Sequence, residues 1–157
     1  MQMNRKKYYI GTFAGIVIIV LILFWYFRMP LPADIVLKGM DSVEKINFGD
    51  YRDERWDYIY NIDIVDEKKI NKIMGEFSKS QYTRVTYKNI INDGRYLSMA
   101  IIHDGTIYRV GINDQGYLNI DDDATYKFTK NNSTIFNELK KHLVSGNEPF
   151  YENDKTR

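Results

Sequence analysis

The side chains that could carry out chemistry in this 157-residue sequence are few, and they lie at two predicted turns. His103 and Asp104 precede Gly105, and an acidic run, Asp121–Asp123, follows a predicted strand. A histidine acts as a general acid or base when a partner group holds it in reach of a substrate, usually in a cleft. The acidic run has oxygen ligands suited to a hard cation such as Ca²⁺, but its spacing differs from that of an EF-hand loop. An enzyme or metal site using His103, Asp104 and Asp121–Asp123 is therefore one of two hypotheses.

The remaining composition offers little other chemistry. The chain has two histidines and no cysteine, and it contains no G-x-S-x-G motif, no H-E-x-x-H motif and no phosphate-binding glycine loop. The second histidine, His142, lies in the last turn of a predicted helix, where a positive charge complements the helix dipole. We therefore expect no catalytic residue, no metal ligand and no cofactor, and we expect that the protein is not an enzyme.

An uncharged apolar stretch, Tyr8–Phe27, determines how the rest of the chain is interpreted. Twenty helical residues span the hydrocarbon core of a bilayer, which is about 30 Å thick. The stretch is longer than the apolar region of a signal peptide and is followed by Arg28 without the small residues of a cleavage site. Tyrosine and tryptophan at its two ends match the aromatic belts of membrane helices. The sequence predicts an uncleaved anchor whose partner is the lipid bilayer.

The charges near this stretch predict its orientation and the division of the chain. Basic residues 5–7 precede it, whereas Arg28 alone follows closely, so the positive-inside rule leaves the N-terminus in the cytoplasm. Four of the 22 basic residues and none of the 21 acidic residues precede residue 30, so the exported part carries a net charge of −3, which gives no indication of nucleic acid binding. We expect a cytoplasmic tail at 1–7, a transmembrane anchor at 8–28, a spacer at 29–39, an extracytoplasmic domain at 40–145 and a polar tail at 146–157.

Gly11 and Gly15 form a G-x-x-x-G pair within the anchor. Two glycines one turn apart allow a second helix to approach closely in lipid, which makes a homodimer one hypothesis. Glycine is also common in membrane helices that do not dimerise, and this pair lies near one end of the stretch.

The exported part has the pattern of one α+β domain. Strands are predicted at 42–48 and 58–65, separated by a turn at 48–50, and Asp66 is predicted to cap a helix. The helix has an apolar stripe of residues 70, 73, 74 and 77, and a second helix carries residues 135, 136, 139 and 143 on one side. We expect a single antiparallel β-meander domain with the two helices covering one face.

Three turns determine the predicted register of the meander between residues 82 and 129. Asp93-Gly94 and Asp104-Gly105 have the composition of two-residue hairpin turns, and Gly116 is expected to be left-handed in a three-residue loop. A last short strand is expected at 124–129. The expected pairs are Ile90 with Leu97, Thr86 with Ile101, Ile101 with Tyr108, Met99 with Val110, and Leu97 with Ile112, with Leu118 and Ile120 on the same apolar face.

Aromatic residues are dense in this chain, which has thirteen tyrosines. Tyrosine and tryptophan combine a large contact area with a polar tip, so exposed clusters favour protein interfaces. The alternative is that most of these rings are half-buried sheet residues. We take Trp56, Tyr58, Tyr87 and Arg109 as the candidate partner surface.

Some local sequences also resemble a known group of proteins. These are D-S-V-E-K-I at 41–46, D-E-K-K-I at 66–70 and Y-K-F at 126–128, in a chain with an anchor helix. The chain resembles small membrane-anchored exported domains of unknown function from low-GC Gram-positive bacteria, although it lacks the lipidatable cysteine of the lipoprotein members. A looser likeness is to membrane-anchored immunity proteins. The resemblance implies the architecture and location and no catalytic residues.

These observations lead to two function hypotheses. The first is a non-catalytic protein-binding or accessory module at the outer membrane face, with an immunity-like role as a special case. The second is the enzyme or metal-binding domain at His103, Asp104 and Asp121–Asp123.

Overall fold

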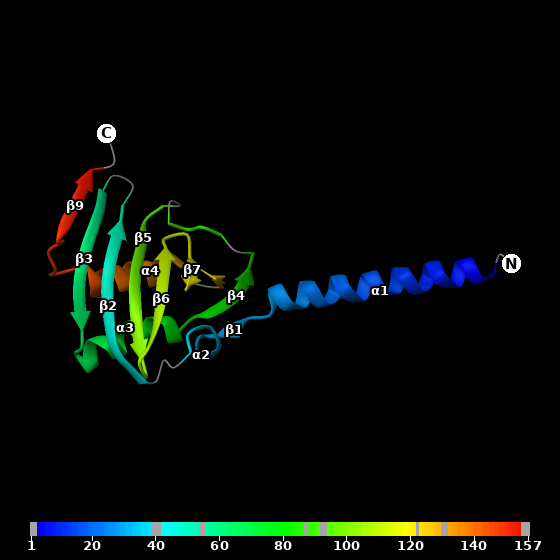
Figure 1. Ribbon diagram of the computed structural model, residues 1–157, viewed down its shortest axis with the longest axis horizontal. Helices are drawn as coiled ribbons and strands as arrows, with labels where there is room; N and C mark the ends of the chain where they lie inside the picture. Colours follow the sequence, from blue (N-terminus) through cyan, green and yellow to red (C-terminus); the bar gives the residue numbers. More distant parts are fainter. Residues whose placement is uncertain are drawn as a thin grey trace.

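The computed structural model describes residues 3–38, 42–53, 56–86, 88–91, 94–121, 123–129 and 132–154. Helix α1 (Met3–Arg28) projects away from a folded domain that contains the other elements (Figure 1). Within α1, the 20-residue segment Tyr9–Arg28 is apolar and none of it is buried against the domain. Its length and composition fit a membrane anchor or a signal sequence.

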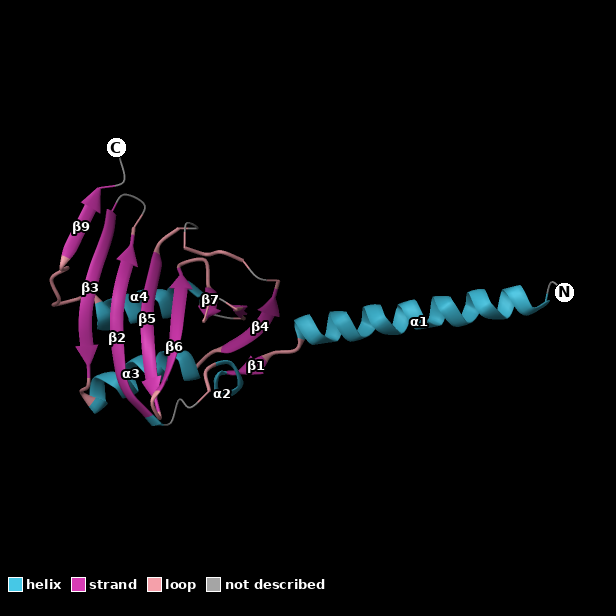
Figure 2. Ribbon diagram, viewed as in Figure 1, coloured by secondary structure: helices cyan, strands magenta, loops and turns pink. Residues whose placement is uncertain are grey.

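One antiparallel sheet forms the centre of the domain, and helices α3 and α4 pack on the same face of it (Figure 2). In the described part of the chain the strand order is β1-β4-β8-β7-β6-β5-β2-β3-β9. The predicted α+β class is therefore confirmed. In chain order the elements after α1 are β1 Leu31–Pro32, α2 Ala33–Val36, β2 Val43–Arg52, β3 Trp56–Ile64, α3 Glu67–Ser78, β4 Gln81–Val85, β5 Tyr96–His103, β6 Thr106–Asn113, β7 Tyr117–Ile120, β8 Ala124–Phe128, α4 Asn132–Leu143 and β9 Tyr151–Asp154.

Both long helices of the domain form where the apolar period predicts them. The Asp66 carboxylate accepts a hydrogen bond of 2.8 Å from the Lys69 backbone N–H, which satisfies a donor at the start of α3. The predicted stripes are buried against the sheet, and both predictions are confirmed: in α3 they are Ile70, Ile73, Met74 and Phe77, and in α4 they are Ile135, Phe136, Leu139 and Leu143.

The β5–β6 hairpin has the predicted register. Asp104 and Gly105 have φ values of +46° and +69°, as a tight hairpin turn requires, and Gly116 has a φ of +83°. The pairs Ile101 with Tyr108, Met99 with Val110, and Leu97 with Ile112 are all present, and Leu118 lies opposite Ile112 on β7.

The predicted hairpin between residues 82 and 97 is wrong. Strand β4 pairs with β1 and β8, and β5 pairs with β2, so the expected pairs Ile90 with Leu97 and Thr86 with Ile101 do not form. Asp93 of the predicted turn lies outside the described residues. Ile90 is fully buried, and the Lys88 carbonyl accepts a hydrogen bond of 3.1 Å from Asn119 Nδ2. Local turn residues favour a change of direction but do not select the strand that β4 pairs with.

The turn predicted at residues 48–50 is also wrong, because β2 continues through it as a bulge. The register of β2 shifts between Phe48 and Asp50 against both of its neighbours. A bulge adds one residue to one strand, so the side-chain alternation changes phase. Phe48 and Tyr51, which would point to opposite faces of a regular strand, are consequently both buried in the core.

The segments at the two ends of the domain carry more structure than their sequences indicate. In the expected spacer 29–39, residues Leu31, Ala33, Val36 and Leu37 are all buried in the core. In the expected polar tail, β9 pairs with the outer side of β3. Elements of two to four residues are shorter than the window over which apolar periodicity can be recognised.

Candidate functional site

The sheet has one face that the helices leave uncovered. On β3, β2, β5 and β6 the side chains that alternate with the buried ones point away from α3 and α4, and we call them the open face. Ile107 and Ile59 of this face are 59% and 44% exposed. Tyr96, Gly111 and Asn113 lie on the same side but are buried. The accessible residues of the open face are Lys45, Asn47, Asp50, Arg52, Asp57, Ile59, Asn61, Asp63, Ser98, Ala100, Ile102, Ile107 and Arg109.

Polar side chains of β2 and β3 on this face hold one another in place. Asn47 Nδ2 donates to Asp63 Oδ1 at 2.8 Å, and Lys45 Nζ lies 3.1 Å from Asp63 Oδ2. These two contacts, the Asn47 hydrogen bond first, lower the pKa of Asp63. The carboxylate is therefore held ionised and in one orientation, which presents a defined pattern of charge.

A pocket of about 180 Å³ lies in the open face where the segment after β4 passes over β6 and β7. Burial raises the pKa of Asp50, and a hydrogen bond from Ser98 partly opposes this. Arg52 Nε lies 3.4 Å from Asp57 Oδ1 and 3.9 Å from Asp50 Oδ2. The remaining lining residues include Ile91, Tyr96, Arg109, Gly111 and Asn119.

The size and charge of this pocket limit what it can hold. Pockets for drug-sized ligands have volumes of about 300–1,000 Å³, so this one suits a single side chain or a small polar molecule. It combines two guanidinium groups, Arg52 and Arg109, with the Asp50 carboxyl group. Hydrogen bonding to a polar group is the chemistry that such an arrangement provides.

The residues that the sequence suggests as one partner surface lie on two different faces. Tyr58 stacks on Tyr51 with ring centroids 5.7 Å apart, on the side of the sheet that the helices cover, and Trp56 shares that side by alternation. Arg109 belongs to the open face. Tyr87 lies outside the described residues. The structure therefore separates Arg109 from Trp56 and Tyr58.

Tyr51 links the sheet to α4 through its hydroxyl group. The hydroxyl donates to Asp53 Oδ2 at 2.9 Å and accepts from Lys140 Nζ at 2.8 Å. Burial, followed by the Asp53 contact, raises the pKa of Tyr51, so the hydroxyl stays protonated and keeps both contacts. Tyr58 stacks on this ring and thus contributes to internal packing.

The histidine and the acidic run occupy separate turns. His103 Nδ1 lies 2.8 Å from Ser42 Oγ, and His103 Nε2 lies 3.3 Å from Asp104 Oδ2. Asp121 Oδ1 instead accepts a hydrogen bond of 2.8 Å from the Arg109 backbone N–H, part-way along β6, and Asp122 lies outside the described residues. Among the described residues, no three His, Cys, Asp or Glu side chains form a group that could hold a metal ion.

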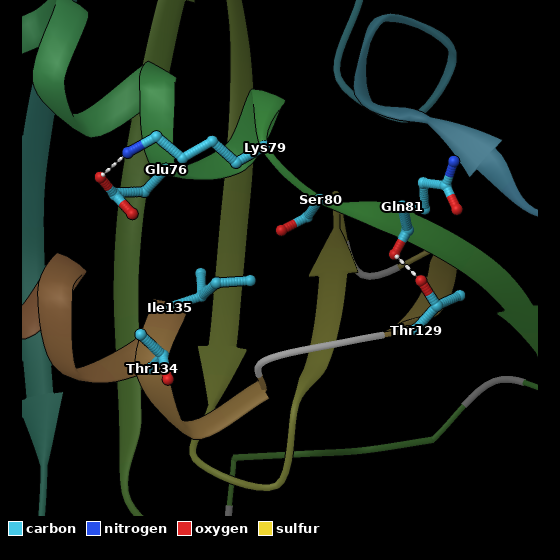
Figure 3. Close-up of a pocket in the computed structure, with 7 residues that line it drawn as sticks. All are labelled: Glu76, Lys79, Ser80, Gln81, Thr129, Thr134 and Ile135. Atoms are coloured by element: carbon cyan, nitrogen blue, oxygen red, sulfur yellow. Dashed lines mark hydrogen bonds and ion pairs between the residues drawn. The ribbon is translucent and has the colours of Figure 1, made fainter.

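A larger pocket, of about 460 Å³, lies between the end of α3, the start of α4 and the adjoining strands (Figure 3). Lys79 Nζ pairs with Glu76 Oε1 at 2.6 Å, so the two charges neutralise each other. Thr129 Oγ1 donates to the Gln81 carbonyl at 3.1 Å, and the Ser80 hydroxyl points into the pocket. No local pattern in the sequence indicates this pocket, because its lining residues come from α3, β4, α4 and the segments that adjoin α3 and β8. Its chemistry suits a neutral polar group.

Neither pocket brings together residues proposed from the sequence, apart from Arg109 in the open-face pocket. Gly11 and Gly15 lie on α1, where a methyl group added at either would meet nothing within 4 Å. Comparison with family models, with curated proteins and with solved structures finds no match to this chain. The resemblance to small exported domains of Gram-positive bacteria therefore stays a prediction.

Proposed function

We propose that this protein is a single-pass membrane-anchored, extracytoplasmic module that binds another protein through the open face and catalyses no reaction. The observation that carries the proposal is the one-sided packing of the domain: α3 and α4 cover one face of the sheet and leave the open face uncovered (Figure 2). Antiparallel sheets commonly face water on one side, so the composition of that face must support the proposal.

The composition of the open face suits a protein partner. Three isoleucines, Ile59, Ile102 and Ile107, lie among six charged residues, three basic and three acidic. Protein interfaces combine apolar area with polar groups of both signs, whereas nucleic acid requires a clear excess of positive charge. The pocket beside Arg109 adds a place where one polar side chain of the partner could be held.

The connection between α1 and the domain supports an anchor that is retained. Two residues, 29 and 30, separate α1 from β1, and Leu31 and Ala33 are 3% and 5% exposed in the core. Cleavage of α1 as a signal peptide, for example after Ala33, would remove β1 and with it the core residues Leu31 and Ala33. Arg84 of β4 also lies over the Tyr26 ring of α1, with 4.5 Å between its guanidinium carbon and the ring centroid.

The direction of α1 indicates how the open face would be presented. The strands lie side by side along a line that continues the axis of α1, with β1 and β4 nearest to α1 and β9 farthest from it (Figure 1). With α1 across a bilayer, the plane of the sheet stands upright on the membrane. The open face then points sideways, toward other proteins that project from the same membrane.

Site-specific photocrosslinking in native membranes tests this function. A photoreactive residue replaces Ile107 on the open face of the full chain, and Lys72, exposed on the outer side of α3, receives it in a matched control. We expect a discrete crosslinked species from position 107 that Arg109→Glu abolishes. Equal products from both positions, or none from position 107, would contradict the proposal. The intact mass of the extracted chain tests the anchor separately, since a cleaved chain lacks α1.

A further inference from the structure

A pocket of about 270 Å³ lies at the junction between α1 and the domain. Tyr26 and Phe27 of α1 form one wall, and Arg84 of β4 lies on the domain side. Asp123, before β8, and Tyr126, on β8, complete the domain side. The pocket therefore exists only where the end of the apolar helix meets the domain, and neither part forms it alone.

The length of α1 places this pocket at a defined depth, on the premise of the membrane anchoring proposed above. The apolar segment Tyr9–Arg28 has 20 residues, a length that spans about 30 Å and matches the hydrocarbon core. Tyr26 and Phe27 come at the end of that segment, where aromatic side chains meet the lipid headgroups. The opening beside them lies in the layer that contains the lipid phosphates.

The charge of Arg84 has no carboxylate partner in the part of the chain that the structure describes. Its guanidinium group lies over the Tyr26 ring, and the residue as a whole is half-buried. Among the described residues, no carboxylate lies within ion-pair distance of it. A planar guanidinium group that is held against an aromatic ring is well suited to binding phosphate oxygens in pairs.

Asp123 gives the same pocket a negative charge, which distinguishes among headgroups. A headgroup with a phosphate alone would meet Arg84 favourably and Asp123 unfavourably. A headgroup that also has an ammonium group would place that group near the carboxylate and near the Tyr26 and Tyr126 rings, which attract cations.

We propose that this pocket binds the zwitterionic headgroup of a membrane phospholipid, with the phosphate on Arg84 and the ammonium group on Asp123. A bound lipid would hold the domain at a fixed angle to α1, because the headgroup contacts both. Phosphatidylethanolamine has this chemistry in its simplest form. The proposal depends on the proposed anchor but not on the open face.

Lipid retention by the purified full chain tests the proposal. The protein, with α1 verified by intact mass, is equilibrated in detergent with equal amounts of phosphatidylethanolamine and phosphatidylglycerol, and native mass spectrometry counts the lipids retained. We expect retention of phosphatidylethanolamine to exceed that of phosphatidylglycerol. Loss of a charged hydrogen-bonding partner should reduce retention by about tenfold in Arg84→Gln, and Asp123→Asn should remove the preference between the two lipids.

Three controls make the result decisive. Arg28→Gln removes a neighbouring arginine that stacks on Phe24 outside the pocket, and it should retain the preference. Arg84→Lys keeps the positive charge and should retain more lipid than Arg84→Gln. This difference shows that the loss in Arg84→Gln comes from the missing charge and not from misfolding. Phosphoethanolamine in water should compete weakly, since it has no acyl chains.

Equal lipid retention by Arg84→Gln and the unchanged chain would overturn the proposal. Full competition by free phosphoethanolamine would overturn the membrane source of the headgroup, and an unchanged lipid preference in Asp123→Asn would overturn the ammonium contact. Failure of the proposed function is recognised differently, by a cleaved chain in cells or by the absence of open-face crosslinks. Absence of open-face crosslinks would leave the lipid proposal standing, whereas a cleaved chain would lack Tyr26 and Phe27 and would overturn both proposals.

Discussion

Gly111→Ala should destabilise the domain because of the ring that lies on this position. A methyl group added at Gly111 would overlap Tyr96 Oη and would lie 2.8 Å from both Cε2 and Cζ of the same ring. Carbon atoms in contact are normally about 3.5–4.0 Å apart, so the ring would have to move by roughly 1 Å. Tyr96 is only 7% exposed, so its ring has little room to move.

The expected magnitude combines two opposing effects. Overpacking of a filled site costs about 1–3 kcal/mol. Replacing glycine by alanine also restricts the unfolded chain, which stabilises by about 0.4–1 kcal/mol. We therefore expect the free energy of unfolding to fall by about 1–2 kcal/mol. Urea unfolding of the full chain in detergent, followed by the circular dichroism of the sheet, measures this change.

A matched glycine and a double-mutant cycle test the reasoning. Gly49 also lies on a strand of the sheet, but a methyl group there would be 3.7 Å from the Ser98 carbonyl oxygen, an ordinary contact, so Gly49→Ala should not destabilise. In a Tyr96→Ala background the ring is absent, and Gly111→Ala should then be neutral or stabilising. An unchanged stability in Gly111→Ala, or the same loss in both backgrounds, would refute the steric explanation.

Three further substitutions have outcomes that follow from the described contacts. Asp66→Ala removes the cap of α3 and should lower the free energy of unfolding by about 1 kcal/mol in urea unfolding, whereas Glu67→Ala, which leaves the cap in place, should lower it less. Tyr82→Phe removes the buried hydrogen bond of 2.8 Å to the Phe77 carbonyl and should cost about 1 kcal/mol by the same measurement. Burial raises the pKa of Asp50, so this residue favours folding at low pH, and its contribution is lost as the pH rises through the pKa of the folded state. In Asp50→Asn the free energy of unfolding should therefore fall less between about pH 4 and pH 7 than in the unchanged chain. An unchanged pH dependence would contradict this reasoning.

Local patterns predicted the elements whose partners are close in the sequence. The Asp104-Gly105 turn leaves one register for β5 and β6, because a two-residue turn with positive φ determines which residues face each other. The stripe of α3 identifies its buried face for a similar reason, since the helical period alone places Ile70 and Phe77 on one side.

Partners that are distant in the sequence could not be predicted in this way. The alternation of apolar and polar side chains in β4 is compatible with any neighbouring strand. Its actual partner is β8, which places Tyr82 opposite Phe128, 46 positions later in the sequence. The bulge at Gly49 changes the phase of β2 without a turn, so Tyr51 points inward although simple alternation from Phe48 points it outward.

The candidate site was only partly accessible to sequence reasoning for the same reason. Arg109 was recognised because β6 belongs to a hairpin with a predictable register. Asp50 joins it in the open-face pocket through the pairing of β2 with β5, and Arg84 meets Tyr26 through the docking of α1 on β4. No local pattern contains either of these contacts.

With α1 across a bilayer, as proposed above, the strand order of the sheet would set how far from the membrane this protein can act. Neighbouring strands are about 4.8 Å apart, so the eight intervals from β1 to β9 extend the domain to about 40 Å above its attachment point. The two-residue connection between α1 and β1 gives the domain little freedom to lean or to extend farther. Under the same proposal, protein partners would be restricted to a layer of that thickness, and the search for them would be two-dimensional. Confinement of this kind raises the effective concentration of any protein in the same layer, so a modest intrinsic affinity would be sufficient for binding.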